Sequence, residues 1–264
     1  MWSSGSGIPK ALRPGTLSLS LNDSDVIFIV LEHSVGARII VLPFLLGSEG
    51  NEKHMARAPD KENLTIPGPA GLLEALLETP PDWASGCVAV LCHPHPRQGG
   101  MMHNKVVHTM VRAMHDLGLA SLRFNFRGVG ASEGKYADGE GEIGDVEAVA
   151  EYIRQRWPEA KLWLAGFSFG AVVSARAAQQ AQPARLISIA PAVNILGREL
   201  AEQLSIPWLV IQGDGDEVVP HRDVVEWVNQ IQPKPRLIVL KGAGHFFHGH
   251  LVELRETLVA TLSE

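Results

Sequence analysis

The sequence predicts an α/β fold in which a mostly parallel, doubly wound sheet carries helices on both faces. From residue 70 on, apolar runs of strand length alternate with amphipathic segments of helix length, as in sheets built from strand–helix–strand units. Near-continuous apolar runs such as CVAVLC and WLVIQ indicate strands that are buried on both faces. Glycine and proline gather where these strands end, and ligands bind at that edge of open α/β sheets.

Each expected strand is an apolar run bounded by turn residues. The expected strands are Gly71–Leu77, Cys87–Cys92, Ala120–Phe126, Lys161–Gly166, Arg185–Ala190, Trp208–Gln212 and Arg236–Lys241. Amphipathic segments between or after them predict the helices. The expected helices are Lys105–Leu117, Glu142–Arg156, Ser168–Gln180, Arg222–Ile231 and Leu251–Leu262.

Composition and charge describe an ordinary globular chain. Of 264 residues, 45% are hydrophobic and 20% are charged, which is enough for a sizeable core. The net charge of −6, without a basic block, argues against nucleic acid or an anionic membrane surface as a partner. Cys87 and Cys92 are expected on opposite faces of one strand, so they should not bridge. We expect a soluble cytoplasmic protein, as a monomer or homodimer.

Residues 1–54 differ in composition from the rest of the chain. A Ser/Gly-rich start precedes the apolar stretch Val26–Leu46, and a polar run follows it. The apolar stretch carries Glu32, His33 and Arg38, and charges near the centre of a membrane span are costly. No clean apolar run with a small-residue cleavage site is present. The stretch therefore predicts neither a membrane span nor a signal peptide.

Two interpretations of this N-terminal part stay open. In the first, residues 1–54 are an extension that is dispensable or results from an over-long start assignment, and the domain comprises residues 55–264. Alternatively, Val26–Leu31 and Arg38–Leu42 form an extra hairpin on the edge of the main domain. A further idea is that the apolar patch docks a partner or a membrane.

Residues 162–171 read LWLAGFSFGA, an apolar strand followed by G-x-S-x-G and an alanine-rich helix. This arrangement is typical of a nucleophilic serine on a sharp strand-to-helix turn, where Gly166 and Gly170 allow close backbone approach. The helix N-terminus would place partial positive charge beside a developing oxyanion. A tight glycine turn can hold an incidental serine, but the flanking strand and helix make Ser168 the candidate nucleophile.

A serine hydroxyl needs a base within reach and a group that orients the base. After Ser168 the strand run WLVIQ ends in the loop GDGDEVVP. We select Asp216 from this loop as the acid. Asp214 lies nearer its strand and is the alternative, although aspartate in such loops is more often a turn residue. Glu217 is expected to be a solvated or helix-entry charge.

The candidate base follows the next strand, in the loop GAGHFFHG. His245 comes directly after G-x-G at the strand end, so we select it. His248 and His250 are alternatives, with His248 expected about one turn further on, at the rim of the site.

Two backbone N–H groups are needed to hold the oxyanion. Phe169, directly after the candidate nucleophile, supplies one. The other should come from the loop HPHPRQGG, where Pro94 and Pro96 have no N–H and His95 is therefore the candidate. His93 and His95 lack a third ligand nearby, so we expect no metal. His93 is expected to make a structural hydrogen bond beneath the site.

Together these motifs resemble the α/β-hydrolase superfamily, and specifically small bacterial serine hydrolases. The motifs read HPHPRQGG at 93–100, RFNFRGVGASEG at 123–134, GFSFG at 166–170 and GHFF at 244–247. The resemblance covers about residues 62–263 and is close to the serine-aminopeptidase-like and dienelactone-hydrolase-like groups, although the latter typically use cysteine as nucleophile. It implies a Ser-His-Asp hydrolase that maps onto Ser168, His245 and Asp216 and uses no cofactor.

Two further features bear on the shape of the site. The loop that contains Arg127 lacks the G-x-x-x-x-G-K-[ST] arrangement of a phosphate-cradling loop, so we expect it to brace the floor of the site, with Arg127 paired to a carboxylate. Many relatives insert a cap after the sixth strand, whereas only Pro191–Ile206 is available here, with room for one short helix in NILGRELAEQL. Little or no cap implies a shallow, open site.

The resemblance and the open site imply a serine esterase, a carboxylic ester hydrolase that cleaves small acyl esters through an acyl-enzyme. A thioesterase or an aminopeptidase-like hydrolase on the same site stays open. A non-catalytic binding protein on this fold is a further alternative, although such proteins usually lack a triad member and all three candidates are present here. The expected partner is a small-molecule acyl substrate, with no nucleic acid and no membrane.

Overall fold

A central sheet of eight strands organises residues 58–263, which the computed structural model describes except for residues 82, 85 and 195–203. Before residue 58, only the backbone of three strands is described. The chain divides into two compact units, Met1–Arg57 and Ala58–Glu264.

In the first unit, β1 (Ser18–Leu21), β2 (Ile27–Leu31) and β3 (Arg38–Val41) form an antiparallel sheet in that order. Strands β2 and β3 fall on the two segments of the hairpin interpretation, and β1 is a third strand that the sequence analysis missed. Whether residues 1–54 are dispensable stays a prediction.

The sheet of the second unit has the order β11-β10-β9-β8-β6-β7-β5-β4. Its strands are β4 (Asp60–Gly68), β5 (Gly71–Thr79), β6 (Cys87–Cys92), β7 (Ala120–Phe124), β8 (Lys161–Phe167), β9 (Arg185–Ile189), β10 (Trp208–Gly213) and β11 (Arg236–Leu240). Strands β6 to β11 pair in parallel, whereas β4 and β5 are antiparallel at one edge. The predicted mostly parallel α/β sheet is confirmed, and β4 is the strand that the sequence analysis did not assign.

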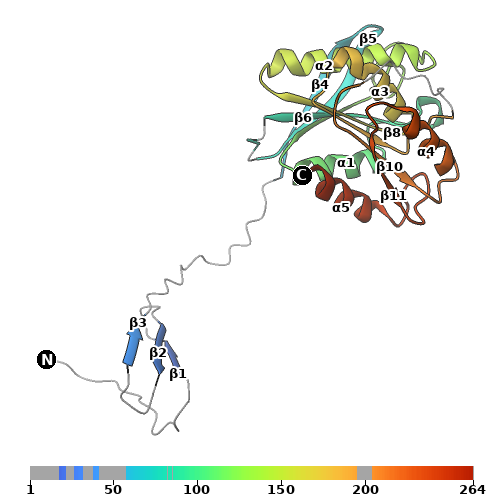
Figure 1. Ribbon diagram of the computed structural model, residues 1–264. Coiled ribbons are helices and arrows are strands. Elements are labelled where there is room, and N and C mark those ends of the chain that lie inside the picture. Colours follow the sequence, from blue (N-terminus) through green and yellow to red (C-terminus); the bar gives the residue numbers. More distant parts are fainter. Residues whose placement is uncertain are drawn as a thin grey trace. The chain divides into compact units, whose positions relative to one another are not determined.

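Helices cover both faces of this sheet (Figure 1). They are α1 (Lys105–Asp116), α2 (Glu140–Arg156), α3 (Phe169–Ala181), α4 (His221–Gln230) and α5 (Leu251–Leu262), with a short 3₁₀ turn at Pro96–Gln98. Helix α1 packs against α5 on one face, and α2 packs against α3 on the other. Each helix lies within two residues of its predicted bounds.

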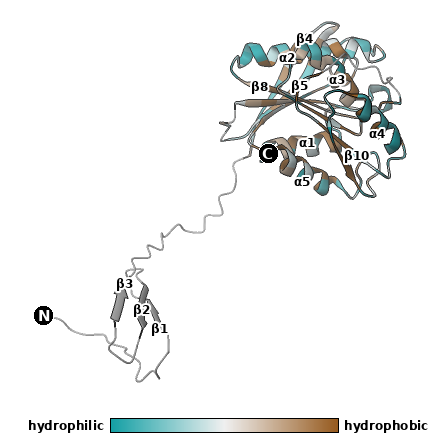
Figure 2. Ribbon diagram, viewed as in Figure 1, coloured by the Kyte–Doolittle hydropathy of each residue, from teal (hydrophilic) through white to brown (hydrophobic). Residues whose placement is uncertain are grey.

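Two apolar cores follow from the alternation of side chains along buried strands. In β6, Val88, Val90 and Cys92 belong to the core beneath α2 and α3, whereas Ala89 and Leu91 belong to the core beneath α1 and α5. Figure 2 shows the apolar strands between helices whose outer faces are hydrophilic. Cys87 and Cys92 form no disulfide with each other, and they pack against different cores, in agreement with their predicted placement on opposite faces of β6.

The parallel strands bring the candidate loops to one edge of the sheet. The loops that hold His95, Ser168, Asp216 and His245 each follow the C-terminal end of a strand. The short helix expected in NILGRELAEQL falls mainly on residues 195–203, which lie outside the described residues. None of the helices in the described part of the chain is long and apolar enough to cross a membrane.

A buried ion pair connects the loop after β7 to α2. The guanidinium of Arg127 contacts Asp145 with a distance of 2.7 Å between Nη2 and Oδ1, and the Arg127 backbone N–H donates to Asp145 Oδ2 at 3.0 Å. The Asp145 side chain is fully buried and that of Arg127 is 11% exposed. Asp145 is thus the carboxylate that the sequence analysis expected opposite Arg127.

We predict that Asp145→Ala lowers the free energy of unfolding by about 3–5 kcal/mol, because it leaves a buried guanidinium without its partner. Urea denaturation of native and variant chains measures this change. Glu151→Ala is the control: it removes a carboxylate from the exposed Arg154 pair at 3.5 Å and should cost less than about 1 kcal/mol. Equal losses in the two variants would contradict a structural role of the buried pair.

Candidate active site

Ser168 occupies a strained turn between β8 and α3. Its backbone has φ 55° and ψ −114°, a region that non-glycine residues rarely adopt. The Ser168 N–H donates to Ile189 O at 2.9 Å, and its carbonyl accepts from Ala192 N at 3.2 Å. These bonds to the last residue of β9 and to the segment after it hold the strained residue in place.

The two glycines of the motif are required by close backbone contacts. A Cβ atom on Gly166 would lie 2.2 Å from the carbonyl oxygen of Gly170. A Cβ atom on Gly170 would lie 2.4 Å from the carbonyl oxygen of Cys92, at the end of β6. Real Cβ contacts are never this short, so the loop after β6 can lie against the serine turn only because both positions are glycine.

A continuous hydrogen-bond chain joins three of the predicted residues. The distance between Ser168 Oγ and His245 Nε2 is 3.0 Å, and that between His245 Nδ1 and Asp216 Oδ2 is 2.8 Å. All three side chains are buried. Because the carboxylate accepts from Nδ1–H, neutral His245 offers its Nε2 lone pair to the serine hydroxyl, which is the arrangement of a base ready to take its proton.

Asp216 is held by four hydrogen bonds. Besides His245, its carboxylate accepts from the backbone N–H groups of Val218 at 2.9 Å and Val219 at 2.7 Å, and from Gln212 Nε2 at 2.9 Å. Burial raises the pKa of Asp216, but the hydrogen bonds from His245 and the two amides outweigh burial and bring the pKa below its usual value. Asp216 is therefore ionised at neutral pH.

Gln212 was missed by the sequence analysis, although it is the one polar residue in the apolar run WLVIQ. It is fully buried at the end of β10, and its Nε2 also donates to Val219 O at 3.1 Å. Gln212 thus ties both the carboxylate and the loop backbone of Asp216 to the sheet.

The neighbouring acids have other partners. Asp214 Oδ1 accepts from Gly242 N at 2.5 Å, so this exposed residue connects the loops after β10 and β11 as a turn residue. Glu217 is exposed, as expected, but its Oε2 also accepts from His245 N at 3.1 Å and so fixes the backbone of that residue. Neither Asp214 nor Glu217 contacts the His245 ring through a described hydrogen bond.

Phe169 and His95 lie next to each other at the serine turn. Their ring centroids are 5.0 Å apart. Phe169 is the first residue of α3, so its N–H has no acceptor within the helix. Among the described residues, no hydrogen bond is made by the backbone N–H of either residue. Two donors thus remain available on the side of Ser168 where the β6 loop approaches.

Tyr136 supports the His95 side of this arrangement and was also missed by the sequence analysis. Its hydroxyl lies 3.1 Å from His95 Nε2, while His95 Nδ1 accepts from Arg97 N at 3.2 Å. Burial and the nearby Arg97 lower the pKa of His95, which favours the neutral ring. With both ring nitrogens engaged, the HPHP loop is held in one conformation.

His248 lies on the exposed surface and not in the hydrogen-bond chain. Its ring stacks on Phe246 with centroids 5.9 Å apart, and the Phe246 ring lies edge-on to His245 at 5.1 Å. His250 instead pairs with Glu253 at 2.7 Å. Within the described residues, no group of three or more His, Cys, Asp or Glu side chains could hold a metal ion.

Comparison with known proteins shows the family of this chain. A family model described as serine aminopeptidase, S33 matches residues 88–200. An α/β serine hydrolase homologue from Coxiella burnetii is 48% identical, with a TM-score of 0.74 over 76% of this chain and 97% of that chain. The chain belongs to the α/β serine hydrolases.

Other relatives of this α/β serine hydrolase extend the comparison. A serine hydrolase without a lid from Xanthomonas campestris is 45% identical, with a TM-score of 0.70 over 75% of this chain and 92% of that chain. An uncharacterised protein from Rickettsia prowazekii is 35% identical over 170 residues, which are 61% of this chain and 71% of the relative. Est1E from Butyrivibrio proteoclasticus, solved with ferulic acid, is 20% identical and shares the fold.

His93 lies beneath the site of this hydrolase and is fully buried. Its Nε2 accepts from Phe126 N at 3.1 Å, and its Nδ1–H donates to Pro94 O at 2.6 Å. Burial lowers the pKa of His93 to about 4. The ring is thus a neutral, structural link between the loops after β6 and β7, which is the role expected from the sequence.

The lowered pKa of His93 predicts a pH-dependent stability. The neutral ring is favoured in the folded state, so its contribution is complete above the unfolded pKa of about 6.5 and is lost as pH falls toward about 4. The full contribution is about 3 kcal/mol. We predict that the free energy of unfolding of the native chain falls more steeply between pH 6.5 and 4 than that of His93→Gln, which cannot titrate there.

Urea denaturation at several pH values checks this prediction. His248→Gln, which removes an exposed histidine instead, should keep the native dependence. Parallel curves for the native chain and His93→Gln would contradict the buried neutral assignment.

Proposed function

We propose that this α/β serine hydrolase is a serine esterase that cleaves small acyl esters through an acyl-enzyme intermediate. The observation that carries the proposal is the hydrogen-bond chain from Ser168 through His245 to Asp216, with distances of 3.0 and 2.8 Å. These distances are within the range required for proton transfer from a serine nucleophile to its base. A binding protein would not need a buried, aligned base beside a strained serine.

The proposed reaction begins with attack of Ser168 Oγ on the ester carbonyl carbon, while His245 Nε2 takes the hydroxyl proton. The backbone N–H groups of Phe169 and His95 are the proposed donors to the oxyanion. His245 then gives its proton to the leaving oxygen, and the acyl group stays on Ser168. Water attacks the acyl-enzyme with His245 again as base, which releases the acid and restores the serine.

Asp216 supports both proton transfers in this scheme. Its lowered pKa keeps the carboxylate ionised, so it stabilises the imidazolium that forms and maintains Nδ1 as the protonated nitrogen. The four hydrogen bonds on the carboxylate limit its movement as His245 changes charge.

The acyl group is proposed to be small because little chain is available to cover the site. Only Pro191–Ile206 separates the β9 segment from the segment that leads into β10. A thioesterase or an aminopeptidase-like hydrolase would use the same residues, and the second agrees with the description of the family model. Activated esters, thioesters and aminoacyl amides of matched acyl groups separate these three substrate classes.

We predict that a fluorophosphonate probe labels the native chain and not Ser168→Ala. His245→Ala and Asp216→Asn should label about 10³–10⁴ times more slowly, because the base is absent or its tautomer is no longer fixed. Labelling rates followed by in-gel fluorescence measure this.

Asp214→Asn is the matched control. It makes the same substitution two positions away, at an aspartate whose carboxylate accepts from Gly242 N instead of contacting His245. It should label at nearly the native rate. A folded native chain that does not label, or an Asp214→Asn variant as slow as Asp216→Asn, would overturn the assignment.

We also propose that residues 1–54 take no part in the chemistry. The hydrogen bonds of the candidate site described above all lie within Ala58–Glu264, the second compact unit. A chain that starts at Met55 is expected to label at the native rate and to unfold at the same urea concentration. Loss of labelling without loss of folding would show that the first unit contributes to the site.

A further inference from the structure

A basic groove of about 290 Å³ lies between the first halves of α1 and α5. Its lining includes Lys105, His108 and Arg112 from α1, and Leu251, Val252 and Arg255 from α5. No carboxylate lines it. For a protein of net charge −6, this is a local concentration of the opposite sign.

The three α1 side chains lie on one face of the helix, because they are spaced by three and four residues. With a rise of 1.5 Å per residue, Lys105 and Arg112 are separated by about 10 Å along the helix. Both are exposed, and neither forms an ion pair with a carboxylate within the described residues. Burial and the nearby Arg123 and Arg112 lower the pKa of His108, as expected beside cations.

Two acidic groups close in the chain to this groove, Asp116 and Glu253, already have partners, whereas Glu256 directly follows Arg255 and acts on its charge. Asp116 accepts from the guanidinium of Arg255, with both N–O distances at 2.5 Å. Glu253 pairs with His250 at 2.7 Å. Lys105 and Arg112 therefore remain unpaired within the described residues and can bind an external anion. On the α5 side of the groove, the exposed Val252 offers an apolar surface.

The position of the groove relates it to the candidate active site. Helix α1 begins just after the loop that holds His95, and α5 begins just after the loop that holds His245. The two helices pack against each other, with their first turns at the edge where the strands end (Figure 1). In the proposed mechanism His245 protonates the leaving group, so the leaving group departs on the side of the His245 loop.

From these observations we infer that the groove binds phosphate groups carried by the leaving group of the substrate. This inference rests on the proposed function and extends it to an ester or thioester of a phosphate-bearing alcohol or thiol. Phosphate oxygens can accept hydrogen bonds from the guanidinium of Arg112 and the ammonium of Lys105. Because the two positions are separated by about 10 Å along α1, they suit a group with more than one phosphate.

The chemistry of the step balances without a further reactant. The bond between the acyl carbon and the leaving sulfur or oxygen breaks as the bond to Ser168 Oγ forms. The serine proton passes through His245 to the leaving atom, and water then hydrolyses the acyl-enzyme.

The test compares three substrates with one acyl group: butyryl-coenzyme A, butyryl-N-acetylcysteamine and 4-nitrophenyl butyrate. The two thioesters have the same reacting bond, but only the first carries phosphates. We expect the native chain to have a kcat/KM at least about tenfold higher for butyryl-coenzyme A, through a lower KM, with an advantage that shrinks as salt is added.

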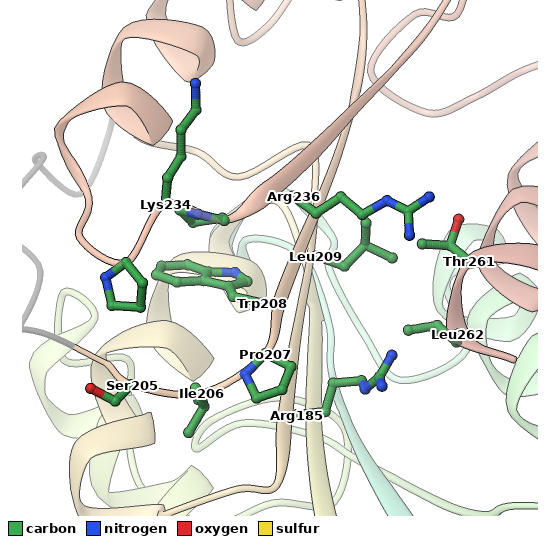
Figure 3. A pocket seen from close by; sticks show the side chains of 12 residues that line it. Arg185, Ser205, Ile206, Pro207, Trp208, Leu209, Lys234, Arg236, Thr261 and Leu262 are labelled. Carbon is green, nitrogen blue, oxygen red and sulfur yellow. The ribbon is translucent and has the colours of Figure 1, made fainter. Parts of the chain in front are cut away.

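The variant K105E/R112E should lose this advantage and keep its native rate with 4-nitrophenyl butyrate. Both positions are exposed, and glutamate at position 105, in the first turn of α1, is favourable, so the variant is expected to fold. Lys234→Glu is the matched control for a charge reversal. Lys234 lines a different cavity, of about 520 Å³, where β10 and β11 begin, at the opposite edge of the sheet (Figure 3).

Three results would overturn the inference. In the first, the native chain cleaves the two thioesters equally well. In the second, K105E/R112E lowers kcat/KM for both thioesters alike. In the third, 4-nitrophenyl butyrate is cleaved and neither thioester is. A native chain that cleaves none of the three substrates would instead refute the proposed function itself.

Discussion

The close approach of two backbone segments at Ser168 is the constraint on which the rest of the site depends. Gly170 lets the end of β6 lie against the first turn of α3, where a single Cβ atom would lie 2.4 Å from Cys92 O. That contact brings the HPHP loop beside Phe169 and leaves Ser168 with a φ of 55°. The energy of this strained turn, of the order of 1–3 kcal/mol, is offset by hydrogen bonds to the end of β9 and the segment after it, and by the cores on both faces of the sheet.

Around this turn, the titratable groups are held in defined and different charge states. Hydrogen bonds keep Asp216 ionised, whereas burial keeps His93 neutral. Each state suits the contacts that the residue makes: an ionised carboxylate accepts from four donors, and a neutral imidazole both accepts from Phe126 N and donates to Pro94 O. The two ring nitrogens of His245 connect the carboxylate of Asp216 to the hydroxyl of Ser168. The charge states of the neighbouring groups thus leave His245 as the residue that takes and returns the proton in the proposed mechanism.

Much of this arrangement could be predicted from the sequence because it depends on local patterns. The ends of β6 and α5 match the predicted ranges, since each is an uninterrupted apolar or amphipathic run with clear ends. Strand β4 was missed because it is an edge strand, largely exposed, with only Ile66 fully buried. Tyr136 was missed for another reason: it is 41 residues from its partner His95, so no spacing rule connects them. The sequence analysis selected Asp216 and kept Asp214 as an alternative, and in the structure Asp216 is the carboxylate that meets the His245 ring.

The charged groups of the candidate active site and those of the groove between α1 and α5 differ in whether they have partners within the protein. In the candidate active site, the side chains of Ser168, His245 and Asp216 meet partners within the protein, so the proposed reaction depends on fixed dipoles and one mobile proton. In the groove between α1 and α5, Lys105 and Arg112 have no such partner in the described chain, although the 29 Asp and Glu residues outnumber the 23 Lys and Arg residues in the whole sequence. Unpaired cations contribute nothing to stability through ion pairing, and they attract anions from solution. Their place in a groove shared with the start of α5, the helix that follows the His245 loop, therefore favours a role in selecting the group that leaves over a role in the fold.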